Sequence, residues 1–334
     1  MTRAISLLSG GLDSILATKV IIDHGIEVEA LNFVSVFCNC TSKGSTCSAG
    51  RSAADQLGIP LKVMEKSEEY LDILKSPKHG YGKNINPCLD CRIFIFKRAK
   101  EYMEQVGASF IVTGEVLGSR PMSQRRQAME LIERESGLKG LVVRPLCAKL
   151  MEPTIPEKEG ILDREKLLAI QGRSRKPQIK MAQEFSIADY PCPSGGCLLT
   201  YEGFANKVRD LMKNKPDFNM DDAKLLKVGR HFRLSPDAKL VVGRDDNENK
   251  RLLSLIKPGD LSFYPLNTNG PLCIGRGRFD AQLLSKASSI VARYSDGNSG
   301  DNLTIVYKNA TDDKVKTIDI KGADEAELGA MRIC

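Results

Sequence analysis

The sequence predicts an α/β protein with a doubly wound parallel sheet at its N-terminus, a basic middle segment and a small α+β C-terminal domain. Up to about residue 117, apolar strand-like segments alternate with amphipathic helical segments, a pattern typical of a parallel sheet covered on both faces. Beyond residue 202, short β-like stretches follow one another closely. We therefore divide the chain into residues 1–117, 118–202 and 203–334.

The first strand and helix are expected at residues 4–8 and 14–24, joined by the turn Ser9-Gly10-Gly11-Leu12-Asp13-Ser14. Two glycines let the backbone pass close to an anion, and the helix N-terminus offers N–H groups and a favourable dipole. Ser9 and Ser14 add hydroxyls, and Asp13 adds a carboxylate suited to a metal ion. The turn lacks the Gly-Lys-Ser/Thr ending of a Walker A loop, which argues against a kinase or GTPase.

The remaining elements of the sheet follow the same alternation. Ligands of such sheets bind outside the carboxyl ends of the strands. The turn at 9–14, the region of Cys38 and the run Thr113-Gly114-Glu115 all lie at such ends, so they could converge on one site. The further strands are expected at 28–36, 61–65 and 110–113, and the further helices at 48–57 and 92–106.

Bulk properties limit the class of protein. With 334 residues, 42% of them apolar, the chain can form two or three domains with real cores. It has no window of about 18 apolar residues and no charged-then-apolar leader, so we expect a cytoplasmic protein without membrane contact. Ten cysteines in that setting point to metal, iron–sulfur or sulfur-transfer chemistry rather than to a disulfide framework. The net charge of +7 suits a polyanionic partner, but many proteins without one carry a similar surplus.

Two cysteine pairs, Cys88 with Cys91 and Cys192 with Cys197, lie about a hundred residues apart. In C-x-x-C both sulfurs can reach one metal or form one disulfide, and at the start of a helix the dipole favours a thiolate at Cys91. Other cysteines have no assigned main role. Cys38, Cys40 and Cys47 have a spacing irregular for zinc fingers, so they could be auxiliary metal ligands, a sulfur relay or spectators. Buried inert thiols are expected at Cys147, Cys273 and Cys334.

The middle segment carries fourteen Lys/Arg against eight Asp/Glu between Gly118 and Lys180. Two runs are candidates for RNA phosphate contacts. The run with Arg125 and Arg126 could equally be a solvated helix face. The run Gln171 to Lys176 combines glycine, serine and three cations, which is more typical of an anion-binding loop. Its candidate residues are Arg173, Arg175 and Lys176.

The C-terminal segment is expected to contain a helix, a Pro/Asn/Asp-rich linker and five β-like stretches. The runs 228–233 and 241–249 are similar to the RNA-binding NFACT-R domain of ribosome-associated quality-control proteins. That resemblance implies RNA contacts from Arg230, His231, Arg233 and Arg244; the alternative is scattered surface cations with a half-buried histidine. The helix is expected at 204–213, the linker at 215–222, and the stretches at 225–233, 239–243, 261–264, 272–276 and 303–307.

All six residues at 9–14 resemble the pyrophosphatase loop (PP-loop) of enzymes that split ATP into AMP and pyrophosphate to adenylate a carbonyl oxygen. Over residues 1 to about 200 the chain is similar to the tRNA thiouridine synthases. Asn86-Pro87 with Cys91 resembles the first catalytic cysteine motif of the 2-thiouridylases, and the run 194–197 resembles the second. Arg92 and Glu115 stand where that group has asparagine and histidine. The basic segment and appended domain resemble those of 4-thiouridine synthases.

The resemblance implies a PP-loop, adenine nucleotide alpha hydrolase-like fold that uses ATP and Mg²⁺. Asp13, Cys91 and Cys197 are then catalytic. A uridine carbonyl oxygen cannot leave unaided, so ATP must adenylate it before sulfur displaces AMP. The residues expected to bind ATP are Ser9, Gly10, Gly11, Asp13, Ser14 and Gly114.

Two sulfur routes fit the same residues. In one, Cys197 carries a persulfide received from a cysteine desulfurase and Cys91 resolves the product as a disulfide. In the other, Cys88, Cys91 and either Cys192 or Cys197 hold a [4Fe–4S] cluster whose open iron binds hydrosulfide, with free sulfide as donor. A structural zinc site is the alternative for these sulfurs.

We therefore expect an ATP-dependent tRNA sulfurtransferase that makes thiouridine. Two other classes remain open. One is a PP-loop amidotransferase or ligase acting on a small molecule, with structural zinc; the other is a non-catalytic RNA-binding factor.

Overall fold

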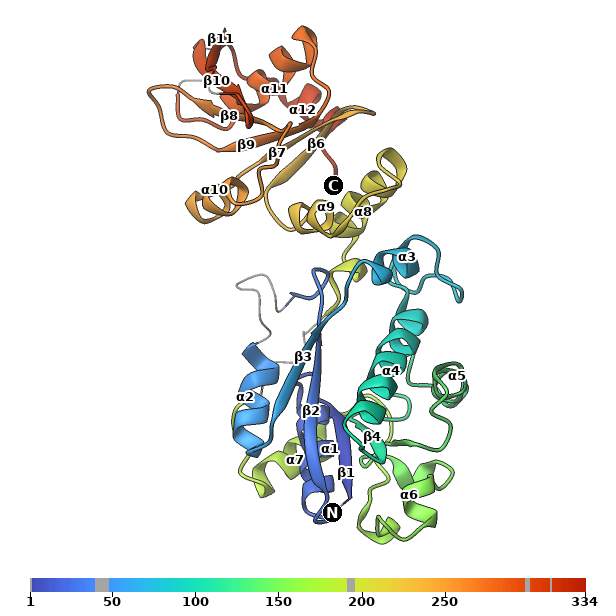
Figure 1. Ribbon diagram of the computed structural model, residues 1–334. Coiled ribbons are helices and arrows are strands. Elements are labelled where there is room, and N and C mark those ends of the chain that lie inside the picture. The colour runs from blue at the N-terminus through green and yellow to red at the C-terminus, as the bar shows by residue number, and fades with distance from the viewer. Residues whose placement is uncertain (1, 40–47, 191–195, 298–300, 313) are drawn as a thin grey trace. The chain divides into compact units, whose positions relative to one another are not determined.

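The computed structural model describes residues 2–39, 48–190, 196–297, 301–312 and 314–334 (Figure 1). The chain divides into two compact units, Met1–Thr200 and Tyr201–Cys334. The basic middle segment is therefore part of the first unit, and no division falls near residue 117. Within the described ranges, none of the helices is long and apolar enough to cross a membrane.

The first unit is built on a parallel sheet with the strand order β3-β2-β1-β4-β5. The predicted bounds of β3 and β4 are correct, and β1 is shifted by one residue. β5 was not predicted because two residues are too few to give a periodic signal. The strands are β1 (Arg3–Leu7), β2 (Glu27–Val34), β3 (Leu61–Glu65), β4 (Phe110–Thr113) and β5 (Val142–Val143).

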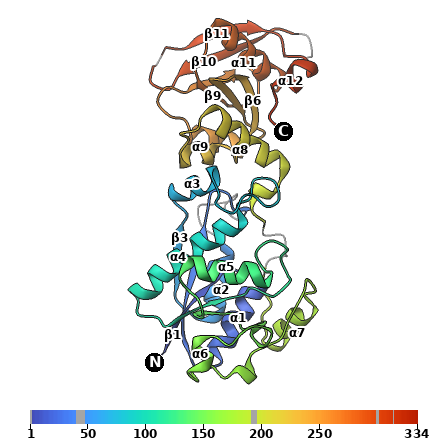
Figure 2. The same cartoon turned by 90° about the vertical axis from the view of Figure 1, so that its right-hand side faces the viewer.

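Helices cover both faces of this sheet, so the predicted doubly wound α/β fold is confirmed (Figures 1 and 2). One face carries α1 (Leu12–Ile22), α2 (Ser48–Leu57) and α7 (Lys176–Glu184), and α1 packs against the other two. The opposite face carries α4 and α5, with α3 packed on α4. Their bounds and that of the short α6 are α3 (Glu69–Lys75), α4 (Cys88–Gln105), α5 (Arg126–Ser136) and α6 (Ile155–Lys158).

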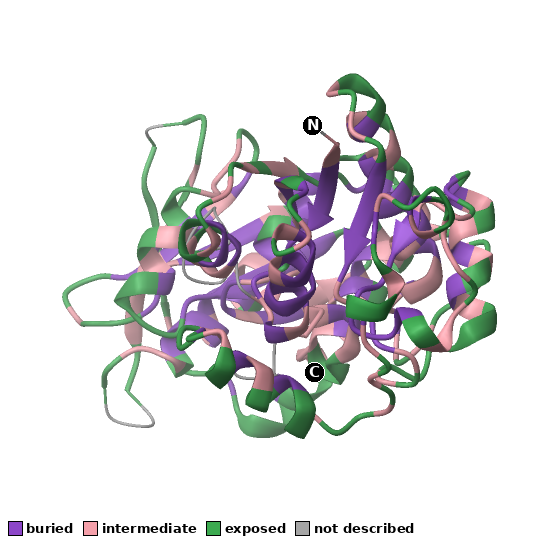
Figure 3. Cartoon of the chain, turned by 90° about the horizontal axis from the view of Figure 1, so that it is seen from below, coloured by how far each residue is buried: buried purple, intermediate pink, exposed green. Residues whose placement is uncertain are grey.

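Burial explains why the first elements form as they do. All four residues of β4 are buried, as expected of a strand covered on both faces. Figure 3 shows buried strands beside the N-terminus. In α1, eight of eleven residues are buried, so the helix is apolar on nearly all sides. The Ser6 and Thr18 hydroxyls, 2.6 Å apart, form a buried hydrogen bond between β1 and α1. These contacts fix the turn between the two elements.

The start of α4 differs from the prediction. The helix begins at Cys88, directly after Pro87, rather than at Arg92. Proline at the helix start is compatible with the fold because the first turn needs no donor from it. Both Cys88 and Cys91 therefore lie in the first turn of α4.

The strand order indicates where a ligand of this sheet would bind. The strand order reverses between β1 and β4, because β2 and β3 lie on one side of β1 and β4 on the other. Ligands of open α/β sheets bind at such a switch point, outside the carboxyl ends of the strands. The turn Ser9 to Ser14 follows β1, and Gly114 follows β4. The two candidate ATP-binding segments therefore flank the switch point.

The second unit has an antiparallel sheet with the order β11-β10-β8-β9-β7-β6, and α11 packs against it. This is the predicted α+β architecture, except that the stretch expected as a strand from residue 225 begins as the end of α9. Its helices are α8 (Glu202–Asn214), α9 (Met220–Leu225), α10 (Asp246–Leu253), α11 (Ala281–Arg293) and α12 (Glu325–Met331). Its strands are β6 (Arg230–Ser235), β7 (Ala238–Val242), β8 (Leu261–Pro265), β9 (Cys273–Gly277), β10 (Leu303–Asn309) and β11 (Lys316–Ile320).

Candidate functional site

The turn between β1 and α1 has the geometry of an anion cradle. Gly10 has a φ of 78°, and a Cβ there would lie 2.4 Å from the backbone of Ala49, so only glycine fits. The Ser14 hydroxyl donates to the carbonyl oxygen of Gly11 at 2.8 Å and lies 3.2 Å from the Ser9 hydroxyl. The N-cap residue of α1 is Gly11, which has no side chain to cap the helix. The first N–H groups of α1 are thus left for an anion.

Gly114 brings the end of β4 against this turn. A Cβ at Gly114 would lie 2.5 Å from the carbonyl carbon of Asp13 and from the amide nitrogen of Ser14. Any residue with a Cβ would clash with the backbone at that separation, so only glycine fits. The structure therefore places Gly114 beside the turn, as its sequence assignment to the ATP site requires.

Asp13 is a partly buried carboxylate at the start of α1. Burial raises its pKa; the charge of Arg175, a hydrogen bond from Gln178 and the charge of Arg120 oppose that rise. Its Oδ1 atom is buried and has no hydrogen-bond partner among the described residues. An orphaned carboxylate oxygen beside an anion cradle fits a Mg²⁺ ion that accompanies ATP phosphates.

The loop at 171–176 lies beside the nucleotide-binding turn. Leu117 and Gln171 form a parallel bridge, and the amide of Gly172 donates to the carbonyl oxygen of Leu117 at 2.8 Å. This bridge holds the loop next to the segment that follows β4. Arg175, expected from sequence to contact RNA, is consequently placed where its charge acts on Asp13.

Three cysteines from distant parts of the chain meet at the same edge of the sheet. Cys91, in the first turn of α4, accepts a hydrogen bond from the Lys66 ammonium at 3.0 Å. Cys38, beyond the end of β2, faces Cys197 in an isolated antiparallel bridge. Electrostatic coupling of Lys66 to Cys91, Cys38 and Cys197 indicates that all four groups are neighbours. The structure thus brings the two predicted catalytic cysteines together and adds Cys38 and Lys66. We call these four residues the thiol cluster.

Lys66 is the least expected member of the thiol cluster. It is 7% exposed, and its ammonium lies 4.7 Å from the centroid of the Tyr70 ring. Burial lowers its pKa, but the charges of Cys91 and Cys38 outweigh burial and raise it overall. A buried ammonium needs an anionic partner, and here the hydrogen-bonded partner is a sulfur rather than a carboxylate. Its position directly after β3 was the only signal in the sequence.

Burial also shifts the pKa values of Cys197 and of Tyr70, a neighbour of the thiol cluster. Burial raises the pKa of the Cys197 thiol to about 12, and the charges of Cys91 and, more weakly, Cys38 add to it. Burial and the charges of Cys91 and Cys197 also raise the pKa of Tyr70 well above its ordinary value. The Tyr70 hydroxyl hydrogen-bonds Cys91. Cys197 is therefore protonated at neutral pH, and Cys91 has two buried donors around its sulfur.

The structure describes three of the four predicted metal ligands. Cys88 lies on the same helical turn as Cys91, but it hydrogen-bonds Ser123 and burial raises its pKa. Cys192 lies outside the described residues. Across the part of the chain that the structure describes, no three His, Cys, Asp or Glu side chains are placed to hold a metal ion. The described sulfurs by themselves therefore do not make up a metal-binding set.

The two departures from the thiouridylase pattern are partners of each other. Arg92 donates through Nε to Oε1 of Glu115 at 3.1 Å, and the buried Arg144 donates to Oε2 at 3.0 Å. Burial alone would raise the pKa of Glu115, but the two arginines lower it. The two residues that differ from the thiouridylase pattern therefore form an ion pair with each other in this chain.

The remaining cations predicted to contact RNA lie mostly on the surface of the first unit. Arg125, Arg173 and Lys176 are exposed. Arg126 is exposed and donates to the carbonyl oxygen of Leu150 at 2.6 Å. These positions are accessible to a polyanion.

In the second unit, the four predicted contacts are in different environments. His231 is 1% exposed, and its Nε2 hydrogen-bonds the carbonyl oxygen of Val228 at 2.8 Å. Burial lowers its pKa well below the ordinary value. A neutral, buried ring cannot contact RNA, so the prediction for His231 is wrong. The neighbouring Phe232, whose side chain points to the opposite face of the strand, is also buried, so both faces of β6 are covered at this point.

The three arginines keep polar or aromatic partners within the second unit. Arg233 pairs with Asp210 at 2.7 Å, and Arg244 pairs with Glu248 at 2.6 Å while its side chain remains half exposed. The guanidinium of Arg230 lies 4.7 Å from the centroid of the Tyr294 ring. Arg244 and Arg230 are thus the better placed for RNA, because Arg233 is held in a part-buried ion pair.

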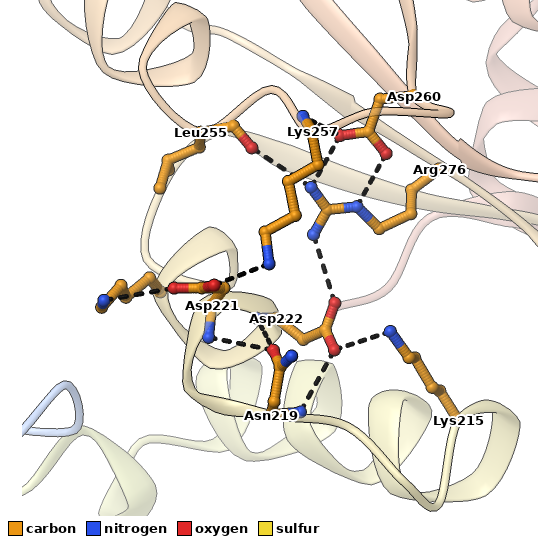
Figure 4. A network of polar contacts seen from close by, with 9 residues as sticks. Lys215, Asn219, Asp221, Asp222, Leu255, Lys257, Asp260 and Arg276 are labelled. Atoms are coloured by element: carbon orange, nitrogen blue, oxygen red, sulfur yellow. Dashed lines mark hydrogen bonds and ion pairs between the residues drawn. The ribbon is translucent and has the colours of Figure 1, made fainter. Parts of the chain in front are cut away.

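An ion-pair network around two buried carboxylates, Asp222 and Asp260, links α9 with β9 and with the segment before β8 in this unit (Figure 4). Arg276 bonds Asp222 at 3.2 Å and Asp260 at 2.7 Å. Lys215 bonds the second oxygen of Asp222 at 2.8 Å, and Lys257 pairs with Asp221 at 2.7 Å. The carboxylates in this network are thus neutralised, which is expected of a structural element.

Comparison with known families gives two matches. Residues 1–155 match the family described as thiamine biosynthesis protein (ThiI), and residues 229–331 match the NFACT protein RNA binding domain. The tRNA-specific 2-thiouridylase MnmA of Sulfurimonas denitrificans is 31% identical, covering 34% of this chain and 35% of that protein. MnmA of Pseudomonas putida is 24% identical over 86% of this chain and 75% of that protein. The matched region is about a third of the length of the first relative.

Solved structures show more distant similarity. A 4-thiouridine synthetase in complex with RNA and ATP is 20% identical, with a TM-score of 0.38, over 68% of this chain and 52% of that chain. The U34-tRNA thiolase NcsA of Methanococcus maripaludis, solved with its [4Fe-4S] cluster, is 14% identical, with a TM-score of 0.31, over 77% of this chain and 74% of that chain.

The fold and the turn at the switch point define a PP-loop α/β protein. The resemblance to the tRNA thiouridine synthases is confirmed by the match of the N-terminal region to ThiI and by the thiouridylase relatives, and the C-terminal region matches the NFACT protein RNA binding domain.

Proposed function

We propose that the protein is an ATP-dependent tRNA sulfurtransferase that adenylates a uridine carbonyl and replaces its oxygen with sulfur. One observation carries the proposal. Cys91 and Cys197, which come from motifs more than a hundred residues apart, meet with Lys66 at the sheet edge that also carries the PP-loop. A site with both parts can activate a carbonyl oxygen and supply the sulfur that replaces it.

The PP-loop supports the activation step. The uncapped N–H groups of α1 would bind the phosphates of ATP, and the orphaned Oδ1 of Asp13 would hold Mg²⁺. Arg175 and Arg120 would add positive charge beside the leaving pyrophosphate. When bound, Mg²⁺ neutralises phosphate charge. Transfer of AMP to the carbonyl oxygen then makes that oxygen a good leaving group.

The thiol cluster supports the sulfur step. A sulfur delivered on a cysteine attacks the adenylated carbon, and AMP departs with the former carbonyl oxygen. Lys66 and Tyr70 hold Cys91 in a fixed place through hydrogen bonds. Because the described sulfurs do not form a metal-binding set, we assign no step to an iron–sulfur cluster or zinc.

Two sets of cations support tRNA as the acceptor. Arg125, Arg173 and Lys176 are exposed in the first unit, and the second unit matches an RNA-binding domain. Electrostatic binding to phosphates predicts an affinity that falls steeply with salt. A ligase acting on a small molecule would show no such salt-dependent tRNA binding.

The test is thiolation in vitro. Purified protein is incubated with unmodified tRNA, ATP, Mg²⁺ and either a cysteine desulfurase with cysteine or sodium sulfide, and the nucleosides are analysed by mass spectrometry. We expect thiouridine and one pyrophosphate released for each thiouridine formed. Cys91→Ala and Cys91→Ser should reduce thiolation at least 100-fold while the melting temperature stays within a few degrees.

The prediction of a buried thiol at Cys334 is wrong, because this C-terminal residue is exposed in the other unit, and Cys334→Ala is therefore the matched control. It should thiolate at the wild-type rate. Thiolation by Cys91→Ala at an unchanged rate would refute the proposal, and so would ATP turnover that tRNA does not stimulate. Iron and zinc analysis of anaerobically purified protein decides whether the sulfur step involves a metal.

A further inference from the structure

Cys38 is the member of the thiol cluster whose role was left open between an auxiliary metal ligand, a sulfur relay and a spectator. It lies four residues beyond the end of β2, where it forms an antiparallel bridge with Cys197. Next to the pair, the amide of Leu198 donates to the carbonyl oxygen of Phe37 at 2.8 Å. The residues flanking the cysteines, rather than the cysteines themselves, thus make this bond. Cys38 and Cys197 occupy a non-hydrogen-bonded position of an antiparallel pair.

That register decides how close the two thiols can come. In non-hydrogen-bonded antiparallel pairs the Cα atoms are about 4.5 Å apart and both side chains point to the same face. Disulfides need Cα atoms about 4.4 to 6.8 Å apart. The separation typical of this register therefore lies within the range that a disulfide spans. Neither takes part in a disulfide in the structure.

Cys91 is the competitor for Cys197. Its charge acts on Cys197 more strongly than that of Cys38 does, so its sulfur is also near. However, the Cys91 sulfur accepts a hydrogen bond from the buried Lys66 at 3.0 Å. A disulfide sulfur cannot become a thiolate, so if Cys91 formed a disulfide, the buried ammonium of Lys66 would be left hydrogen-bonded to a sulfur that cannot carry a negative charge. Oxidation of Cys38 leaves that pair intact.

We propose that Cys38 is the resolving thiol of the sulfur-transfer reaction and forms a disulfide with Cys197 at the end of each turnover. This inference rests on the proposed function and assigns its sulfur route. The terminal sulfur of a Cys197 persulfide attacks the adenylated carbon and displaces AMP, which leaves the base joined to Cys197 through two sulfurs. The Cys38 thiolate then attacks the Cys197 sulfur. The bond between the two transferred sulfurs breaks, and its electron pair leaves with the base as thiouridine.

The reaction requires a reductant after each turnover. Each turnover oxidises Cys38 and Cys197 by two electrons in total, so a dithiol reductant must open the disulfide before Cys197 accepts new sulfur. Without reductant the protein performs one turnover and stops. Cys91 and Lys66 remain a hydrogen-bonded pair throughout and position the neighbouring sulfurs.

The experiment is a single turnover without reductant. Protein loaded with sulfur by a cysteine desulfurase and freed of excess donor is mixed with ATP, Mg²⁺ and tRNA, quenched in acid with N-ethylmaleimide, and digested. Tandem mass spectrometry locates the linked cysteines, because Cys38 shares its tryptic peptide with Cys40, and Cys197 shares its own with Cys192. We expect a Cys38–Cys197 link in an amount equal to the thiouridine formed.

Variants separate the two candidate resolving thiols. Cys38→Ser should accumulate tRNA covalently attached to Cys197 and slow thiouridine release at least tenfold, whereas Cys334→Ser should match the wild type. A Cys91–Cys197 link, or normal release by Cys38→Ser, overturns the inference while leaving the proposed function standing. If no thiouridine forms at all, the proposed function fails instead. Treatment with diamide in the absence of tRNA then still tests the pairing, since it should link Cys38 to Cys197 first, and a different first link overturns it.

Discussion

Two regions of this molecule bury charged side chains in opposite ways. In the second unit, the buried Asp222 and Asp260 are both bonded to Arg276, and Lys215 completes the arrangement (Figure 4). At the sheet edge of the first unit, Oδ1 of Asp13 has no partner among the described residues, and the buried Lys66 is bonded to a sulfur. In the second unit the buried carboxylates are satisfied by cations of the chain itself. At the sheet edge of the first unit, a buried carboxylate oxygen is left able to bind a ligand.

The difference separates structural from functional charge. Burying an ion is costly, so a network that serves only the fold must satisfy each charge from within the chain. An incompletely satisfied charge persists where a ligand or a reaction completes it. The comparison therefore predicts that mutations in the network of Figure 4 act on stability, and that mutations at the PP-loop act on catalysis.

The largest effect is expected from Arg276→Met, which leaves Asp222 and Asp260 buried without their shared partner. Removing one member of a buried ion pair typically costs about 3–5 kcal/mol. We expect the free energy of unfolding of the second unit to fall by about that amount in urea denaturation. The exposed pair of Lys224 with Asp221 is the control, because Lys224→Met should change stability by less than about 0.5 kcal/mol. Equal effects of the two variants would contradict a structural role for the network.

Asp13→Asn tests whether a mutation at the PP-loop acts on catalysis rather than on stability. The loss of the carboxylate that would hold Mg²⁺ should lower the rate of ATP cleavage by about 10²–10³-fold, the range typical of lost electrostatic stabilisation at active sites. Because burial raises the pKa of Asp13, its ionised form is disfavoured in the folded state, so the variant should be at least as stable as the wild type above that pKa. Pyrophosphate release and thermal melting measure the two properties. A melting temperature lowered as much as by Arg276→Met would show that Asp13 is structural.

The sequence was most informative where one local pattern determines the structure. The apolar runs predicted the bounds of β3 and β4. The turns after β1 and β4 predicted that Gly10 and Gly114 lie at the switch point of the sheet. Long-range pairing was not accessible in this way. Cys38 and Lys66 join the thiol cluster only because β2 and β3 end at the same edge of the sheet as the other elements.

Burial of single polar residues was also beyond the sequence. His231 stands next to Arg230 in a stretch that matches an RNA-binding domain, but the sheet places its ring in the core. Likewise, nothing in the separate runs around Arg92 and Glu115 shows that the two side chains form an ion pair. Such facts depend on which faces of distant elements pack together.

The smallest effect is expected at Arg175. The sequence predicted an RNA contact for this residue, but in the structure its charge acts on Asp13. Its charge acts on that carboxylate, and the loop that carries it is fixed to Leu117 by a backbone hydrogen bond. Arg175→Ala should therefore weaken ATP binding about tenfold, equivalent to about 1.4 kcal/mol, and leave tRNA affinity nearly unchanged. Arg173→Ala, an exposed cation two residues earlier, should do the reverse: it should weaken tRNA binding, reduce its salt dependence and leave the KM for ATP unchanged. If both variants lost only tRNA affinity, the loop would belong wholly to the RNA surface, and the PP-loop would need another source of positive charge.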